Sequence, residues 1–170
     1  MSRAEVPPSV VLQPVDDDVL ERLVQAAQAD ASADEVTPPL TAGEEWTPER
    51  VEWLRAFHRS RRSGLDGPER EATWAVLADG VVVGAVRLKR VAESPSAEVG
   101  LWLTRAARGR GVGRRAVEAV LAEARVGGVT AVRADTTATN GPARAVLRSL
   151  GFDSTPVDED GVIAWLALEE

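Results

Sequence analysis

The sequence predicts a mixed α/β (α+β) fold, in which a mixed sheet of six to seven strands is flanked by about four helices. Three observations predict it: short apolar segments typical of strands, longer segments with apolar residues at helical spacing, and turn residues between them. The resulting order is β-α-α-β-β-β-α-β-α-β-β. The 170 residues suit a single domain, which we place at residues 9–170, behind a flexible stretch at residues 1–8.

The first part of the chain predicts one strand and two helices. Residues 9–15 are typical of a strand, and the three aspartates that follow can cap a helix whose apolar residues share one face. Residues 29–46 are rich in Ala, Asp, Thr and Pro, which predicts a loop. The pair Thr47-Pro48 then indicates the start of a second helix, which ends at Gly64.

The middle of the chain predicts three consecutive strands. Residues 72–78 and 81–91 flank Asp79-Gly80, which is a strong signal for a two-residue hairpin turn. Residues 97–103 follow a short turn and form the third strand. A glycine-rich segment comes next, at residues 108–115.

The last part of the chain predicts a parallel crossover. The helix after the glycine-rich segment ends at Gly127-Gly128, and residues 129–134 form the next strand. A connection long enough for a helix implies that the strands on either side of it run parallel. Asn140 can cap a short helix that reaches Leu150, and residues 161–168 form the last strand.

The composition excludes several kinds of site. The chain has no cysteine and one histidine, His58, so a thiol nucleophile, a thiolate metal site, a His-based metal centre and a Ser-His-Asp triad are all disfavoured. We expect no metal. No run of about 18 apolar residues and no apolar signal segment are present, so we expect a cytoplasmic protein without a membrane partner.

The charges are unevenly distributed. The formal net charge of −7 argues against a nucleic-acid partner. Residues 30–49 hold six acids and no base, whereas residues 105–115 hold five arginines and no acid. One region therefore favours cations and the other favours anions, unless both are simply solvated faces.

The glycine-rich segment, Arg-Gly-Arg-Gly-Val-Gly-Arg-Arg at residues 108–115, is the strongest candidate for a binding site. Glycines at alternate positions allow consecutive backbone N–H groups to converge on a phosphate at a helix N-terminus, and the arginines add charge. A glycine-rich turn with solvated arginines is the alternative.

A dinucleotide-binding fold is one interpretation of this segment, because residues 111–116 satisfy G-x-G-x-x-[GA] and Asp135 follows the next strand. The context disfavours it. In that fold the first glycine follows the strand almost at once, whereas residues 104–110 intervene here, and 57 residues remain after Gly113.

The second interpretation is binding of coenzyme A, because the chain resembles the GNAT acyltransferases. Their signature Q/R-x-x-G-x-G/A matches residues 108–113, between a strand and a helix. The branch of Rim-type ribosomal-protein N-terminal acetyltransferases carries N-x-x-S-x-x-V-L-x-x-x-G-F, and most of this pattern recurs at residues 140–152. The resemblance covers roughly residues 9–168.

This resemblance implies a binding site for acetyl-CoA as a cosubstrate. The backbone of residues 109–113 would hold the pyrophosphate, the nearby arginines would add charge, and the strand at residues 97–103 would pair with the pantetheine arm. Asn140 would lie near the thioester. The implied coenzyme-binding residues are Leu101, Leu103, Arg108, Gly109, Arg110, Gly111, Val112, Gly113, Arg114 and Asn140.

The resemblance also implies two candidates for the general base. Glu98 occupies the position where several GNAT enzymes carry a glutamate, and its strand face also carries Gly100 and Trp102, which would open and wall a cleft. Asp135 matches the base of another branch. We prefer Glu98, although either carboxylate would also suit an ordinary surface ion pair.

The chain departs from the family at the group that protonates the leaving thiolate. Many relatives place a tyrosine where this chain has Leu147, and the Rim-like branch places a serine where it has Ala143. Water, Ser149 or Thr139 would have to replace them. The alternative function is a non-catalytic acyl-CoA-binding or regulatory module of the same fold.

The acceptor is predicted from the charge pattern and from its place in the family. In this fold the acid-rich residues 30–49 and the helix that follows border the acceptor, which favours a cationic primary amine, either a protein N-terminus or a small amine. Three tryptophans would line that cleft or lie in the core: Trp46, Trp53 and Trp74. We expect His58 to be an exposed helix residue, and a homodimer is possible.

Overall fold

The chain forms one seven-stranded sheet with helices on both faces. The structure, a computed structural model, describes residues 6–169. The strands are β1 (Val10–Pro14), β2 (Glu71–Ala78), β3 (Val81–Arg90), β4 (Ser96–Leu103), β5 (Ala131–Thr137), β6 (Asp153–Pro156) and β7 (Gly161–Ala167). They lie in the order β1-β2-β3-β4-β5-β7-β6, and the pairing of β4 with β5 is parallel whereas the others are antiparallel.

The helices follow the predicted order, which confirms the fold class. They are α1 (Asp17–Asp30), α2 (Ala33–Val36), α3 (Pro48–Ser60), α4 (Val112–Val126) and α5 (Gly141–Ser149), with 3₁₀ turns at Gly64–Asp66 and Arg105–Ala107. The predicted helix caps form as expected. The Asp16 side chain accepts a hydrogen bond from the Val19 N–H, and Thr47 caps α3 in the same way.

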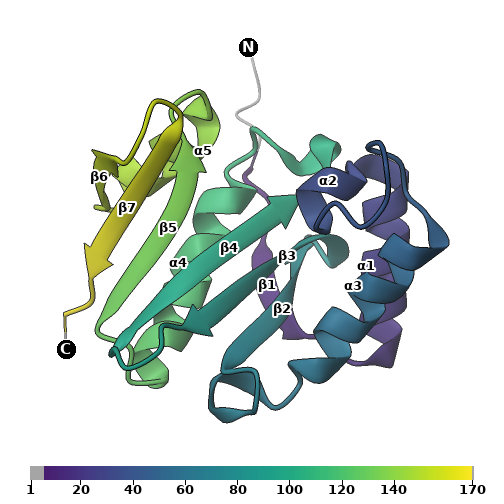
Figure 1. The fold of residues 1–170 in the computed structure, drawn as a ribbon, viewed down its shortest axis with the longest axis horizontal. Coiled ribbons are helices and arrows are strands. Elements are labelled where there is room, and N and C mark those ends of the chain that lie inside the picture. Colours follow the sequence, from purple (N-terminus) through teal and green to yellow (C-terminus); the bar gives the residue numbers. More distant parts are fainter. Residues whose placement is uncertain (1–5, 170) are drawn as a thin grey trace.

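Two apolar cores lie on opposite faces of the sheet. Helices α1 and α3 pack over β2 and β3 on one face, around Leu20, Leu23 and Leu54. Helix α4 packs on the other face, and Leu147 of α5 and Phe152 belong to the same core. Figure 1 shows α4 crossing the sheet near its middle while α1 and α3 lie together at one end.

The sheet opens between β4 and β5. Their parallel ladder covers four residue pairs and ends at the pair Val99–Ala134, although both strands continue beyond it. The remainder of β4 stays paired with β3 on its other side. Backbone groups on the β5 side of residues 100–103 therefore face a gap rather than a neighbouring strand.

The structure corrects three local expectations. The predicted strand at residues 129–134 begins two residues later and extends to Thr137, because Val129 N–H still donates to the Ala124 carbonyl at the end of α4. The predicted loop at residues 29–46 contains the short helix α2. The second helix ends at Ser60, four residues before Gly64.

Candidate functional site

A cavity of about 740 Å³ occupies the gap between β4 and β5. Its walls come from β4, from the glycine-rich segment before α4, from β5 and from the start of α5. Of the predicted site residues, those that line it are Leu101, Leu103, Arg108, Gly109, Gly111, Gly113, Arg114, Asp135 and Asn140. Arg110, Val112 and Glu98 are not part of this lining, and Val112, the first residue of α4, points into the core between α4 and the sheet.

The N-terminus of α4 faces this cavity without a cap of its own. Gly111 precedes the helix in the left-handed conformation, with φ of 78°, and offers no side chain to the first N–H groups. The first turn contains no acidic residue, whereas α1 begins with Asp17 and Asp18. The positive end of the α4 dipole is therefore left for an anionic ligand.

The arginines around the segment differ in their contacts. Arg108 donates to the Glu35 carboxylate over 2.6 Å and also to the Leu103 carbonyl. Arg114 lies 3.4 Å from Glu118, one helical turn further along α4. Arg110 has no ion pair within the described chain, so its charge is not neutralised by a neighbour.

The backbone of β4 presents hydrogen-bonding groups to the cavity. Thr104 N–H donates to the Val83 carbonyl of β3, and the direction of these groups alternates along a strand. The N–H and carbonyl groups of Leu101 and Leu103 therefore point away from β3, into the gap. The bond from Arg108 to the Leu103 carbonyl agrees with this direction.

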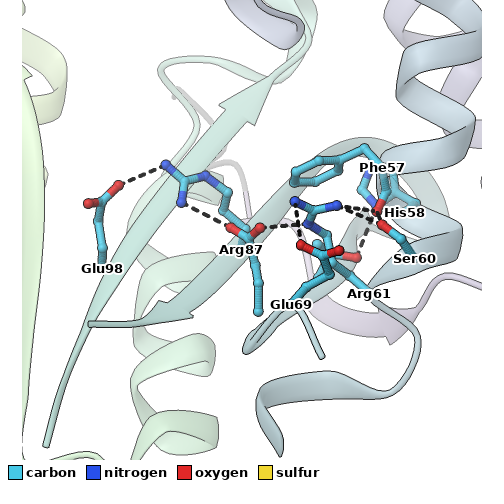
Figure 2. Close-up of polar contacts among 9 residues, drawn as sticks. Phe57, His58, Ser60, Arg61, Glu69, Arg87 and Glu98 are labelled. Carbon is cyan, nitrogen blue, oxygen red and sulfur yellow. Dashed lines mark hydrogen bonds and ion pairs between the residues drawn. The ribbon is translucent and has the colours of Figure 1, made fainter. Parts of the chain in front are cut away.

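The two candidate bases are both held by arginines. Arg87 donates to Glu98 over 2.9 Å and to the buried Glu71 over 3.2 Å, and Figure 2 shows its guanidinium beside Glu98. Arg133 binds both oxygens of Asp135, at 2.8 and 3.0 Å. These hydrogen bonds lower the pKa of the Asp135 carboxyl, which makes it a weaker base than a free aspartate.

The start of α5 closes the cavity on the side of β5. The Asn140 side chain accepts a hydrogen bond from Ala143 N–H and caps the helix while it also lines the cavity. Leu147 and Ala143 line the cavity too. Ser149 and Thr139 lie outside this lining, whereas Thr136, which sequence reasoning missed, belongs to it.

His58 is buried, so the expectation of an exposed residue is wrong. It is 2% exposed, and its Nδ1 lies 3.0 Å from the Thr73 hydroxyl of β2. The helical spacing of α3 left its orientation open, because the sequence does not show which strand packs against this turn. Burial and, to a lesser extent, the charge of Arg61 lower the pKa of His58 from 6.5 to about 4.

This burial predicts a loss of stability in mild acid. The unfolded chain binds a proton at His58 below about pH 6.5, whereas the folded protein resists it until about pH 4. The free energy of unfolding should therefore fall as the pH falls through this window, by about 3 kcal/mol in all. Urea unfolding measures the free energy of unfolding at pH 7 and at pH 4.5, and its decrease between the two should be smaller for His58→Gln than for the wild type. Equal decreases would contradict the assignment of this pH dependence to His58.

The acid-rich segment is largely engaged by the protein itself. Asp34 accepts from Arg50, a fully buried guanidinium that also donates to Thr41 and to the Gly43 carbonyl. Asp30 accepts from the Ala106 N–H, and Glu35 pairs with Arg108. Half of the six acids therefore fix the segment against α3 and the glycine-rich loop.

The predicted tryptophans separate into two groups. Trp53 lines a smaller cavity that adjoins the first, together with Gly100 and Trp102 of β4. Trp46 packs against the core under α1 and donates to the Ala31 carbonyl, whereas Trp74 packs against the core under α4. Trp46 and Trp74 line neither cavity, which agrees with the alternative that places them against the core.

Comparisons with known proteins place these features in context. The family model of the acetyltransferase (GNAT) domain matches residues 9–153. No curated protein matches the chain in sequence. Over residues 6–169, no helix is both long and apolar enough to cross a membrane, and no three His, Cys, Asp or Glu side chains gather around a possible metal position.

Three solved structures share the fold at low sequence identity. RimJ from Mycobacterium smegmatis, in complex with CoA-disulfide, has a TM-score of 0.74 at 19% identity, over 93% of this chain and 81% of that chain. RimL, a ribosomal L7/L12 alpha-N-protein acetyltransferase in complex with coenzyme A, has a TM-score of 0.71 at 14% sequence identity, and the match covers 94% of each chain. PaiA N-acetyltransferase from Thermoplasma acidophilum, also in complex with coenzyme A, has a TM-score of 0.64 at 18% sequence identity, and the match covers 94% of this chain and 99% of that chain.

Proposed function

Because the chain belongs to the GNAT acetyltransferase family of acetyl-CoA-dependent transferases, we propose that it transfers the acetyl group directly to a primary amine of a cationic acceptor. One observation carries the proposal. The uncapped N-terminus of α4 and the unpaired edge of β4 face the same cavity of about 740 Å³. A phosphate group and a peptide-like chain are the ligands that these two features bind best.

The proposed position of acetyl-CoA follows from this arrangement. The pyrophosphate accepts hydrogen bonds from the backbone of residues 109–113, and Arg108, Arg110 and Arg114 supply charge. The pantetheine arm pairs with the backbone of Leu101 and Leu103, as an added strand would. The thioester then lies near Asn140 and the point where β4 and β5 separate. RimL and PaiA, which share the fold, are in complex with coenzyme A.

The transfer requires three events. The acceptor ammonium loses a proton, its nitrogen attacks the thioester carbonyl carbon, and the C–S bond breaks so that the coenzyme leaves as a thiol. Backbone N–H groups at the edge of β4 are aligned to polarise the carbonyl oxygen. A thiol pKa of about 8.5 makes the coenzyme a tolerable leaving group. Thr136 is the hydroxyl side chain in the cavity lining that we propose as a relay, which receives a proton released by the attacking nitrogen as it passes its own proton to the departing sulfur.

Glu98 is the proposed base, and it acts through one water molecule. It lies outside the cavity lining, but it shares a strand face with Gly100, about 6.6 Å away along β4. A base separated from its proton by one water can still act. Asp135 lines the cavity, but its lowered pKa makes it the weaker candidate.

The proposed acceptor is a protein N-terminus or a small amine. Glu44, Glu45 and Glu49 lie on the acid-rich segment without an ion pair in the described chain, so they leave negative charge on the segment that we propose borders the acceptor. The RimL structure is described as an alpha-N-protein acetyltransferase, which supports the choice of a protein N-terminus.

A coenzyme-release assay tests the proposed function. Purified protein is mixed with acetyl-CoA and a panel of peptide N-termini and small amines, and free thiol is measured. We expect saturable release that depends on the amine, with N-acetylated product in the mass spectrum. Saturable acetyl-CoA binding without release on any acceptor would instead indicate a non-catalytic module.

A further inference from the structure

A second cavity, of about 250 Å³, lies between α3 and the sheet, on the face opposite α4. Helix α3 forms one wall and residues of β2, β3 and β4 form the other, while α2 closes one end. Its volume is below the roughly 300–1,000 Å³ of pockets for drug-sized ligands. A single side chain or a group of similar size would fill it.

The walls of this second cavity are mainly apolar and aromatic. The rings of Trp53 and Phe57 stack with their centroids 5.0 Å apart, and Trp102 and Leu54 also line the space. The opposite wall holds Ala85, whose small side chain leaves room that a larger residue would fill. Such a lining favours an apolar or flat aromatic group.

The charged groups around this cavity are already paired. Arg87 is held by Glu71 and Glu98, and Glu35 is held by Arg108. His58 bonds to Thr73 and is neutral near pH 7, because burial lowers its pKa to about 4. A cationic group that entered would find no unpaired carboxylate among the lining residues, so an uncharged group fits better.

The two cavities meet at β4. Glu35, Gly100, Leu101 and Trp102 line both of them. Gly100 has no side chain, and a Cβ at this position would lie 2.6 Å from Nε of Arg87. The absence of a side chain here lets the second cavity open next to the point where β4 leaves β5, which is where the proposed thioester lies.

We propose that the second cavity binds an uncharged apolar or aromatic group that the acceptor carries next to its amine. This inference rests on the proposed function, because it places the amine itself at the junction of the two cavities. The acceptor would then be an N-terminus with a large apolar first residue or an arylalkylamine, rather than a polyamine with a second charge at this distance.

Matched acceptors test this selectivity. The peptide amides X-Gly-Ser-Gly, with Phe, Leu, Gly or Lys as X, differ only at the first residue. We expect kcat/KM for Phe to exceed that for Gly and for Lys by at least about 10-fold. Equilibrium binding of the same peptides to the protein saturated with coenzyme A should show the same order, which gives a readout that does not need turnover.

Two variants locate the preference in this cavity. Ala85→Leu fills the space and should reduce the ratio of Phe to Gly to below about 3-fold, with unchanged acetyl-CoA affinity. If Ala85→Leu fails to fold, Trp53→Ala provides the same test, because it removes one wall of the cavity and should also reduce this ratio. Ala78→Leu, a similarly buried change that lines neither cavity, is the control and should keep the wild-type preference.

The outcomes separate the two proposals. Equal turnover and equal binding of the Phe and Gly peptides would overturn this inference, as would a preference that survives both cavity variants. Absence of turnover with retained preference for Phe in binding would support the inference and contradict the proposed transfer activity.

Discussion

Gly111→Val is expected to weaken acetyl-CoA binding at least about 100-fold and to leave the fold intact. Gly111 has a φ of 78°, a region that β-branched residues rarely adopt. The substitution should shift the loop out of this conformation and turn away the N–H groups that precede α4. Loss of two charge-assisted hydrogen bonds, at about 1.5–3 kcal/mol each, is enough for this change in affinity. Titration calorimetry with coenzyme A measures it.

Gly128→Val is the matched control for backbone strain. Gly128 has a φ of 76°, and a Cβ there, as at Gly111, would meet no atom within 4 Å. It follows the C-terminus of α4 and lines neither cavity. Both variants should lose about 1–2 kcal/mol of stability, but only Gly111→Val should lose affinity. If Gly111→Val binds coenzyme A as tightly as the wild type, the glycine-rich segment is not part of the binding site. If both variants lose affinity equally, the loss comes from backbone strain and not from the segment itself.

Local signals were sufficient to predict most of the fold. Asp16 and Thr47 cap their helices as expected, and Asp79-Gly80 turns the hairpin with positive φ at both residues. These features depend on neighbours in sequence, so the sequence contains the information. The glycine-rich segment belongs to the same class, since the left-handed conformation of Gly109 and Gly111 is a local property.

Features that depend on packing between distant segments were not predictable. His58 is buried because α3 lies on β2, which places Thr73 beside its ring. Arg50 is fully buried because residues 34–43 fold back around its guanidinium. The helical period of α3 gave no sign of either partner, since polar residues on a helix usually face solvent.

The candidate site also combines features that local sequence predicts with features that depend on the packing of distant segments. Motif spacing indicated the loop, the edge of β4 and Asn140, all of which line one cavity. The partner of Glu98 was not visible in the sequence, because Arg87 reaches it only through the register of β3 and β4. Arg133, in contrast, lies two residues before Asp135 on the same face of β5, so strand alternation was a local signal that could have identified this pair. The second cavity requires α3 to be placed over a strand wall that includes Ala85 and Gly100, which no local pattern predicts.

Glu98→Gln is expected to lower kcat by about 100-fold with little change in the affinity for acetyl-CoA. The amide keeps the size of the side chain and still accepts a hydrogen bond from Arg87, so the network that includes Glu71 should persist. What is lost is the ability to take a proton from the acceptor through water. Steady-state kinetics with the best acceptor, together with coenzyme titration, measures both quantities.

Asp135→Asn is the control that distinguishes the two carboxylates. Because hydrogen bonds from Arg133 already lower the pKa of Asp135, its loss should change kcat by less than about 3-fold. The rate of Glu98→Gln should also increase with pH up to the pKa of the acceptor amine, since only amine that is already neutral reacts without a base. An unchanged kcat for Glu98→Gln, with a large decrease for Asp135→Asn, would transfer the role to Asp135. Such a result would mean that direct access to the cavity matters more for proton removal than the strength of the base.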